Sequence, residues 1–176
     1  MNRRNFLKTA AAISLGASFT GCQTNLKKVL TKKDQRQNFL FILVDDMGWT
    51  DLGCYGSDFY ETPNIDRLAS EGMKFTNAYA ASSVCAPTRA SIFTGKYPAR
   101  IGMNFILNRG FTGPKYKLQA PECADKLELS EVTFAEVLKS AGYKTFFAGK
   151  WHLGEEEKYY PQNQGFDINI GGHKGG

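Results

Sequence analysis

The sequence predicts an α/β fold in which a mostly parallel sheet is flanked by helices. The first observation is a run of six apolar residues, 39–44 (Phe-Leu-Phe-Ile-Leu-Val), that does not alternate with polar residues. A short continuous run of this kind is typical of a strand buried on both faces of a parallel sheet. The second observation is that short apolar segments alternate with helical segments along the chain, which is the order of elements found in parallel α/β folds.

The next elements lie between residues 62 and 79. Residues 62–63 (Thr-Pro) open a predicted helix over 64–71, whose apolar residues share one face, and Gly72 is a natural terminator for it. Residues 75–79 (Phe-Thr-Asn-Ala-Tyr) are a candidate second strand. The chain therefore continues the alternation that starts with the first apolar run.

The later elements follow a loop at residues 81–87. A short helix is expected to start near Thr88. Residues 133–136 (Thr-Phe-Ala-Glu) fit a capping box, in which the side chains of the first and last of these residues bond the free backbone N–H groups at a helix start. That helix is expected to run to about Ser140. Residues 144–148 (Lys-Thr-Phe-Phe-Ala) are a third predicted strand.

The N-terminal residues predict an export signal at 1–22 and a polar, basic tether at 23–37. A twin arginine, Arg3-Arg4, precedes an apolar stretch rich in small residues, and paired arginines resemble the twin-arginine class of signals. The stretch is ~13 residues long, too short to span ~30 Å of hydrocarbon as a helix. We therefore expect an exported protein of the periplasm or cell envelope.

The end of this signal, Phe-Thr-Gly-Cys at residues 19–22, resembles a bacterial lipobox. A membrane lipid anchor at Cys22 is one expected outcome, and an ordinary cleavage site with an incidental cysteine is the alternative. The folded body is expected to begin at residue 38 and to continue to residue 176.

Charge is distributed unevenly between the leader and the body. The chain has 22 basic and 17 acidic residues, but residues 1–36 hold eight of the basic residues and one of the acidic ones. The remainder has 14 basic and 16 acidic residues, a net charge of −2. A body that bound nucleic acid would need a basic face, so we expect no nucleic-acid partner.

Polar side chains follow the predicted strands at the positions where open α/β sheets bind ligands. Asp45 and Asp46 follow the first strand, Cys85 lies in the loop after the second, and Lys150 and His152 follow the third. Adjacent carboxylates suit a hard divalent cation. Taken singly, these residues have structural alternatives: a turn or helix cap for the acidic pair, a packed thiol, a surface lysine and a histidine at the core edge.

Four motifs shift that balance because they resemble those of one family. Residues 85–95 (Cys-Ala-Pro-Thr-Arg-Ala-Ser-Ile-Phe-Thr-Gly) are similar to the signature of the type I sulfatases, which belong to the alkaline phosphatase superfamily. Residues 149–154 (Gly-Lys-Trp-His-Leu-Gly) resemble a second signature of that family, 44–49 its metal-binding strand end, and 62–69 its first helix. The resemblance runs from about residue 38 to residue 172 and implies the N-terminal portion of an alkaline phosphatase-like sulfatase fold.

The resemblance implies a cofactor and a modified residue. By likeness to the family, a formylglycine-generating maturase would oxidise Cys85 to formylglycine, and one hydroxyl of its hydrate would attack sulfur. Asp45 and Asp46 would bind a divalent cation, usually Ca²⁺, which the residue made from Cys85 would also contact. The cation would polarise the sulfate oxygens.

The resemblance also gives roles to three further residues. Arg89 would hold the hydrate and neutralise charge, and Lys150 would bridge the hydrate and the sulfate as a fixed cation. His152 would take a proton from the remaining hydroxyl and so expel sulfate. A surface arginine, a surface lysine and a core-edge histidine are the alternatives for these residues.

The function implied is hydrolysis of sulfate monoesters, of sulfated carbohydrate or of an aryl sulfate. The alternatives are a phosphate or phosphonate monoester hydrolase of the same superfamily and a catalytically inactive remnant. The family's later Asp-Asn pair, histidine and lysine have no counterpart in this sequence, so we expect a truncated product with no appreciable activity on its own. Cys54 and Cys123 are expected to be unpaired thiols, although an oxidising compartment would permit a disulfide between them.

Overall fold

The computed structural model describes residues 36–105, 114 and 116–173. The chain divides into two units, residues 1–44 and residues 45–176. The predicted export signal and all but the last two residues of the predicted tether (23–37) lie outside the described residues, and the lipid-anchor prediction lies there too. Among the described residues, no helix is long and apolar enough to cross a bilayer.

Two predicted strands are absent from the structure. Residues 39–44 and 75–79 are assigned neither helix nor strand, and the side chains of the first run are exposed, Leu40 by 86%. The predictions failed because a strand needs a hydrogen-bonded neighbour, whereas an apolar run specifies only a tendency toward burial. The apolar runs alone therefore overestimated the number of strands in the sheet.

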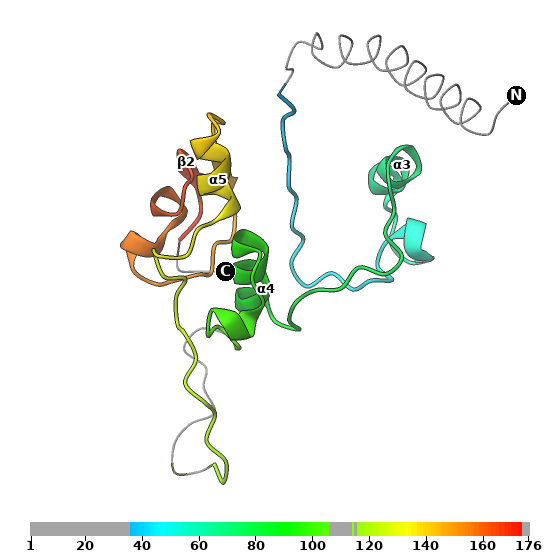
Figure 1. Ribbon diagram of the computed structural model, residues 1–176. Helices are drawn as coiled ribbons and strands as arrows, with labels where there is room; N and C mark the ends of the chain where they lie inside the picture. Colours follow the sequence, from blue (N-terminus) through cyan, green and yellow to red (C-terminus); the bar gives the residue numbers. More distant parts are fainter. Residues whose placement is uncertain (1–35, 106–113, 115, 174–176) are drawn as a thin grey trace, which may run out of the picture. The chain divides into compact units, whose positions relative to one another are not determined.

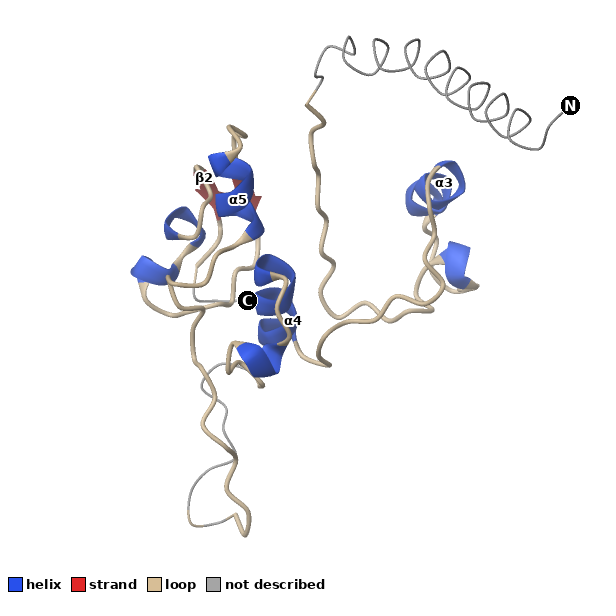
Figure 2. Ribbon diagram, in the orientation of Figure 1, coloured by secondary structure: helices blue, strands red, loops and turns tan. Residues whose placement is uncertain are grey.

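The second unit contains three α-helices, four 3₁₀ turns and two short strands among its described residues (Figures 1 and 2). The elements are η1 (Gly53–Tyr55), α3 (Pro63–Glu71), α4 (Cys85–Thr94), η2 (Pro98–Arg100), α5 (Phe134–Ser140), β1 (Phe146–Ala148), η3 (Glu157–Tyr159), η4 (Pro161–Asn163) and β2 (Ile168–Ile170). Most of the remaining described residues form loops and turns.

Helix α3 begins and ends as the sequence predicts. Pro63 occupies the first turn, where its missing N–H costs no intrahelical hydrogen bond. At the other end, the backbone N–H of Gly72 donates to the carbonyl of Leu68 at 2.9 Å. The helix has no buried residue and packs against η1.

Helix α4 begins at Cys85, three residues before the predicted start near Thr88. Val84 is its N-terminal flanking residue and has an extended backbone, with φ −131° and ψ 158°. Pro87 lies within the first helical turn, where backbone N–H groups have no intrahelical acceptor, so the proline does not interrupt the helix. Cys85 is therefore the first residue of a helix and not part of a loop.

Helix α5 has the capping box that its sequence predicts. The Glu136 N–H donates to the Thr133 hydroxyl at 3.2 Å, and the Thr133 N–H donates to the Glu136 carboxylate at 2.7 Å. The Thr133 hydroxyl also donates to the carbonyl of Gln164 at 2.8 Å. The capping residue Thr133 thus satisfies a backbone N–H at the start of α5 and also joins that helix to the segment before β2.

The sheet consists of β1 and β2, which pair in parallel with Phe146 opposite Ile168 and Ala148 opposite Ile170. The predicted strand at 144–148 corresponds to β1. The sequence analysis did not identify β2, because its three residues offer only two apolar side chains. The parallel pair with its neighbouring helices confirms the α/β class, for this part of the domain.

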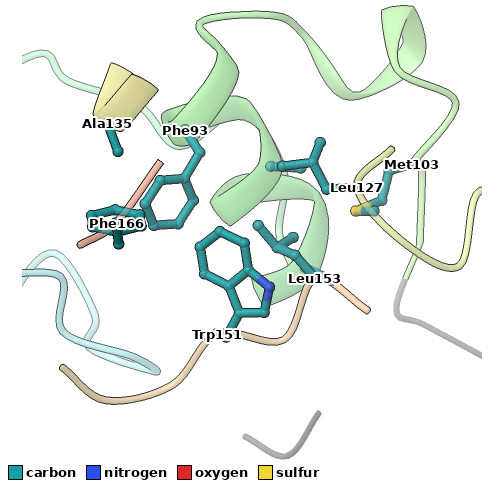
Figure 3. Packing of buried hydrophobic residues seen from close by; sticks show 9 residues of the cluster. Phe93, Met103, Leu127, Ala135, Trp151, Leu153 and Phe166 are labelled. Atoms are coloured by element: carbon teal, nitrogen blue, oxygen red, sulfur yellow. The ribbon is translucent and has the colours of Figure 1, made fainter. Parts of the chain in front are cut away.

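The core gathers around an aromatic cluster formed by Phe93, Phe134, Phe147, Trp151 and Phe166. Figure 3 shows three of these side chains, Phe93, Trp151 and Phe166. Buried aliphatic and small side chains extend it: Ala86, Ala90, Met103, Leu127, Ala135 and Leu153. These residues come from α4, α5 and β1, from the segment between η2 and α5, and from the segment between β1 and β2. The core therefore joins the helix that carries Cys85 to the segment that carries Lys150 and His152.

Candidate active site

Five of the six candidate residues come together in the structure, from three separate segments. Cys85 and Arg89 lie one turn apart on α4. Lys150 and His152 lie in the loop that leaves β1, and Asp45 follows the first apolar run. Their side chains are joined by the hydrogen bonds and ion pairs described below. Residues up to 107 positions apart in the sequence thus share one site.

The start of α4 is held by contacts to the preceding loop. The Thr88 hydroxyl donates to the carbonyl of Ser82 at 2.9 Å, and the Val84 N–H donates to the Ser82 hydroxyl at 3.4 Å. On the inner side of the helix, Ala86, Ala90 and Phe93 are buried in the core. These contacts fix the backbone of Cys85, whose side chain is only partly buried.

Cys85 faces His152. The Sγ atom of Cys85 lies 3.3 Å from Nδ1 of His152, a distance at which a thiol can donate to an unprotonated ring nitrogen. His152 has a left-handed backbone, with φ 58°, a conformation that non-glycine residues seldom adopt. The local turn therefore directs the imidazole toward the first residue of α4.

Arg89, Asp45 and Lys150 form a charged cluster beside this pair. The Arg89 guanidinium donates to Asp45 Oδ1 at 3.2 Å, and Lys150 Nζ donates to Asp45 Oδ2 at 2.6 Å. A second nitrogen of Arg89 donates to the backbone carbonyl of Lys150 at 2.5 Å. Arg89 is 5% exposed, and its buried Nε has no hydrogen-bond partner among the described residues. The cluster carries two positive charges and one negative charge.

The charges affect the titration of two site residues. The hydrogen bond from Lys150, with the bond and charge of Arg89, lowers the pKa of Asp45 against the opposing effect of burial. Burial lowers the pKa of His152 below its usual 6.5, and the positive charges of Lys150 and Arg89 lower it further, while Asp45 acts in the opposite direction. Because a lowered pKa favours the neutral ring, His152 is suited to accept a proton at neutral pH.

The predicted metal ligands are not gathered into a cluster. Within the described ranges, no three His, Cys, Asp or Glu side chains lie close enough together to hold a metal ion. Asp46 has a left-handed backbone, φ 54°, and takes no part in the hydrogen bonds that join the other five candidates. Carboxylate oxygens of Asp45 and Asp46 have the donor chemistry that Ca²⁺ prefers. The pair fits part of such a ligand set.

Two further cysteines of the described residues, Cys54 and Cys123, take no part in the contacts of the site. Cys54 and Cys123 are free thiols in the structure, as is Cys85. Cys54 belongs to η1, and Cys123 lies in the exposed segment before α5. The unpaired state that the sequence analysis expected for Cys54 and Cys123 is therefore the one observed.

Trp151, which was not among the residues predicted from the sequence, lies between two site residues and is completely buried. Its Nε1–H donates to the carbonyl of Tyr159 at 2.8 Å. A tryptophan between a lysine and a histidine indicates a buried position in a polar loop, because an indole is unfavourable in solvent. That signal could have identified the residue as the anchor of this loop.

Comparison with known proteins places these features in one family. A sequence model of the sulfatase family matches residues 37–175. Human arylsulfatase G is 41% identical over 169 residues, which cover 94% of this chain and 29% of that protein. N-acetylgalactosamine-6-sulfatase of the pig (Sus scrofa) is 44% identical over 138 residues, covering 78% of this chain and 26% of that protein.

Solved structures give the same result. The crystal structure of Ps i-CgsB in complex with k-i-k-neocarrahexaose matches with a TM-score of 0.59 and 34% identity, and the match covers 73% of this chain and 27% of that chain. The chain thus spans less than a third of the length of the relatives it matches. The similarity covers the segments that contribute Asp45, Cys85, Arg89, Lys150 and His152.

Proposed function

This chain belongs to the sulfatase family, and on that basis we propose that the protein is a sulfuric ester hydrolase that cleaves sulfate monoesters. The family generally uses formylglycine and a divalent cation. Here Cys85 would be the residue converted to formylglycine, Asp45 and Asp46 would hold the cation, and Ca²⁺ is the ion we propose. When present, the formylglycine hydrate supplies the nucleophile and the cation polarises the sulfate oxygens.

The observation that carries the proposal is the grouping of Cys85 with two cations and one neutral base. A sulfate monoester is anionic and repels nucleophiles, so its hydrolysis needs positive charge at the place where negative charge develops. Lys150 and Arg89 supply that charge within hydrogen-bonding distance of a shared carboxylate, Asp45. A site with only a thiol and a histidine would lack it.

Each residue has a separate proposed role. Lys150, which is partly exposed, would contact a sulfate oxygen directly. Arg89 is buried and would act on the residue at position 85 from one helical turn away, where its guanidinium is held by the Lys150 carbonyl. His152 would hold and release the proton of the group at position 85, because its Nδ1 already faces that side chain.

We propose a sulfated glycan as the substrate class, with an aryl sulfate as a usable surrogate. The support comes from two relatives: one is an N-acetylgalactosamine-6-sulfatase, and one was crystallised in complex with a neocarrahexaose. Both names refer to carbohydrates. We also propose export of the protein, conversion of Cys85 by a formylglycine-generating maturase, and a lipid anchor at Cys22 after signal cleavage.

The proposal is tested by co-expressing the chain with an active maturase. Peptide mass spectrometry should find an aldehyde in place of the thiol at Cys85 and unmodified thiols at Cys54 and Cys123, which serve as internal controls. The converted protein is then given a matched aryl sulfate and aryl phosphate with added Ca²⁺. Sulfate release above that of Cys85→Ala, however slow, supports the reaction class. A persistent thiol at Cys85, or phosphate release that exceeds sulfate release, would contradict the proposal.

A further inference from the structure

We propose that Trp151 is a positioning residue of this site, which holds Lys150 and His152 in register with Cys85 and Arg89. The catalytic importance of this role depends on the proposed function, whereas its geometry depends only on how the chain packs. Trp151 is 0% exposed, whereas its two neighbours are partly exposed. The indole therefore anchors the loop from within while the two polar side chains reach the site.

The first contact that fixes Trp151 is polar. Its Nε1–H is buried and donates to the carbonyl of Tyr159, in η3, at 2.8 Å. A buried N–H without an acceptor is destabilising, so this bond selects one orientation of the ring. The Tyr159 backbone thereby holds the far end of the indole.

The second contact is aromatic and leads directly to the helix of the site. The ring centroid of Trp151 lies 4.8 Å from that of Phe93, with the two ring planes tilted by 52°, and Figure 3 shows the two rings next to each other in the core. Phe93 is on α4, one turn beyond Arg89 and two turns beyond Cys85. Phe147, on β1, lies 5.3 Å from Trp151 on another side. A displacement of the indole would therefore move the loop relative to α4.

The site contacts lie immediately on both sides of this anchor. Before Trp151, the carbonyl of Lys150 accepts from Arg89 at 2.5 Å. After it, the ring of His152 lies 3.3 Å from Cys85 Sγ, on a backbone with a left-handed φ. An unusual backbone conformation persists only when its surroundings determine it. Trp151 directly precedes His152 in the sequence and is completely buried. It is therefore the nearest buried side chain on the N-terminal side of the left-handed residue.

The test uses the unconverted protein, so it requires neither maturation nor sulfatase activity. The rate of Cys85 alkylation by iodoacetamide is followed peptide by peptide at neutral pH, with Cys54 as the internal reference for the reagent and the melting temperature of each variant as the check on folding. His152→Ala gives the rate for a thiol without its imidazole partner. Because thiol reactivity follows the local environment and small displacements have large effects, we expect Trp151→Leu to change the Cys85 rate by about tenfold, toward that of His152→Ala.

Phe166→Leu is the matched control. Phe166 is in the same aromatic cluster and is 5% exposed, but its neighbours in sequence are not site residues. Its ring centroid lies 6.3 Å from that of Trp151, farther than that of Phe93. It should lower the melting temperature and leave the Cys85 rate, relative to Cys54, unchanged. Trp151→Phe keeps an aromatic ring and removes the bond to Tyr159, so it should fold even if Trp151→Leu does not, with an intermediate Cys85 rate.

The outcomes separate the positioning role from general core packing. A wild-type Cys85 rate in folded Trp151→Phe and Trp151→Leu would overturn the proposal. An equal change of the Cys85 rate in Phe166→Leu would overturn it too, because any loss of core packing would then suffice. Failure of Cys85 conversion by the maturase would contradict the proposed function and leave this result intact.

Discussion

Helices α3 and α4 are of similar length but are held in opposite ways. Five residues of α4 are buried, among them Ala86, Ala90 and Phe93, and none of α3 is. α3 is instead joined to η1 by polar contacts: the Cys54 N–H donates to Asp66 at 2.7 Å, and the Gly53 N–H donates to the Thr62 hydroxyl at 2.9 Å. The Thr62 hydroxyl in turn donates to Asp66 at 3.0 Å. The helix that carries Cys85, the proposed reactive residue, is thus fixed by apolar packing. Hydrogen bonds fix α3, which carries none of the candidate residues.

The difference indicates where substitutions will act. Apolar burial is cumulative and cooperative across the core, so damage to α4 should reach the whole unit. Directed hydrogen bonds act over a few residues, so damage near α3 should stay local. The predictions that follow separate these two kinds of contact.

The largest effect is expected from Phe93→Ala. Phe93 is 5% exposed and contacts four other aromatic rings, so its truncation should lower the free energy of unfolding by about 3–5 kcal/mol. Urea denaturation monitored by circular dichroism measures this. Ile65→Ala on α3 is the matched variant, since Ile65 is 42% exposed and should cost little. Equal losses in the two variants would remove the contrast between the helices.

A smaller, local effect is expected from Asp66→Ala. This change leaves the Cys54 N–H and the Thr62 hydroxyl without their acceptor, and a lost hydrogen bond of this kind costs about 1–3 kcal/mol. Hydrogen exchange should become faster at residues 53–55 and 63–71 and remain unchanged in α4. Asp66→Asn, which keeps one acceptor oxygen, should lie between. Faster exchange in both helices would mean that they unfold together.

Thr133→Ala tests α5, which combines both kinds of contact. The variant loses the capping box and the buried bond to the Gln164 carbonyl, so we expect a loss of about 1 kcal/mol, with a range of about 0.5–2 kcal/mol. Thr133→Ser keeps the hydroxyl and should retain most of the wild-type stability. Differential scanning calorimetry of the two variants decides this, and a serine variant as unstable as the alanine variant would point to the lost methyl group instead.

The smallest effect is expected from Asp167→Asn, and it should depend on pH. The ion pair with Lys139 and the hydrogen bond from the Thr145 N–H lower the pKa of Asp167 from 3.8 to about 2. A lowered pKa contributes stability that is complete above the unfolded value of 3.8 and is lost as pH falls toward 2. Melting temperatures of the two proteins should therefore differ at pH 6 and converge near pH 2. A difference independent of pH would contradict the ion-pair explanation.

The sequence predicted the helices better than the sheet because helix signals are local. Thr62-Pro63 and the capping box at 133–136 identified α3 and α5 from side chains and backbone within a few residues. The strand predictions at 39–44 and 75–79 were wrong, and β2 was missed, since pairing depends on partners distant in the sequence. Only β1 was found, from an apolar run that ends at a glycine.

The site could be predicted as a set of residues but not as a geometry. Motif order pointed to Asp45, Cys85, Arg89, Lys150 and His152, and all five meet. Arg89 is buried, and there it donates to Asp45 and to the Lys150 carbonyl. The motif does not specify this burial. Asp46 takes no part in the hydrogen bonds that join the other five, and its left-handed backbone is a conformation that the sequence does not specify directly.

The left-handed turn at His152 also bears on how this protein can diverge. Histidine, asparagine and aspartate adopt a positive φ several times more often than other non-glycine residues. At φ 58°, the backbone thus admits few replacements before any chemistry is considered. An ancestor or an engineered variant that exchanged this imidazole for a lysine or glutamate base would first have to rebuild the turn. Mutational drift at this position is therefore restricted twice, by the conformation of the chain and by the proton transfer that we propose for it.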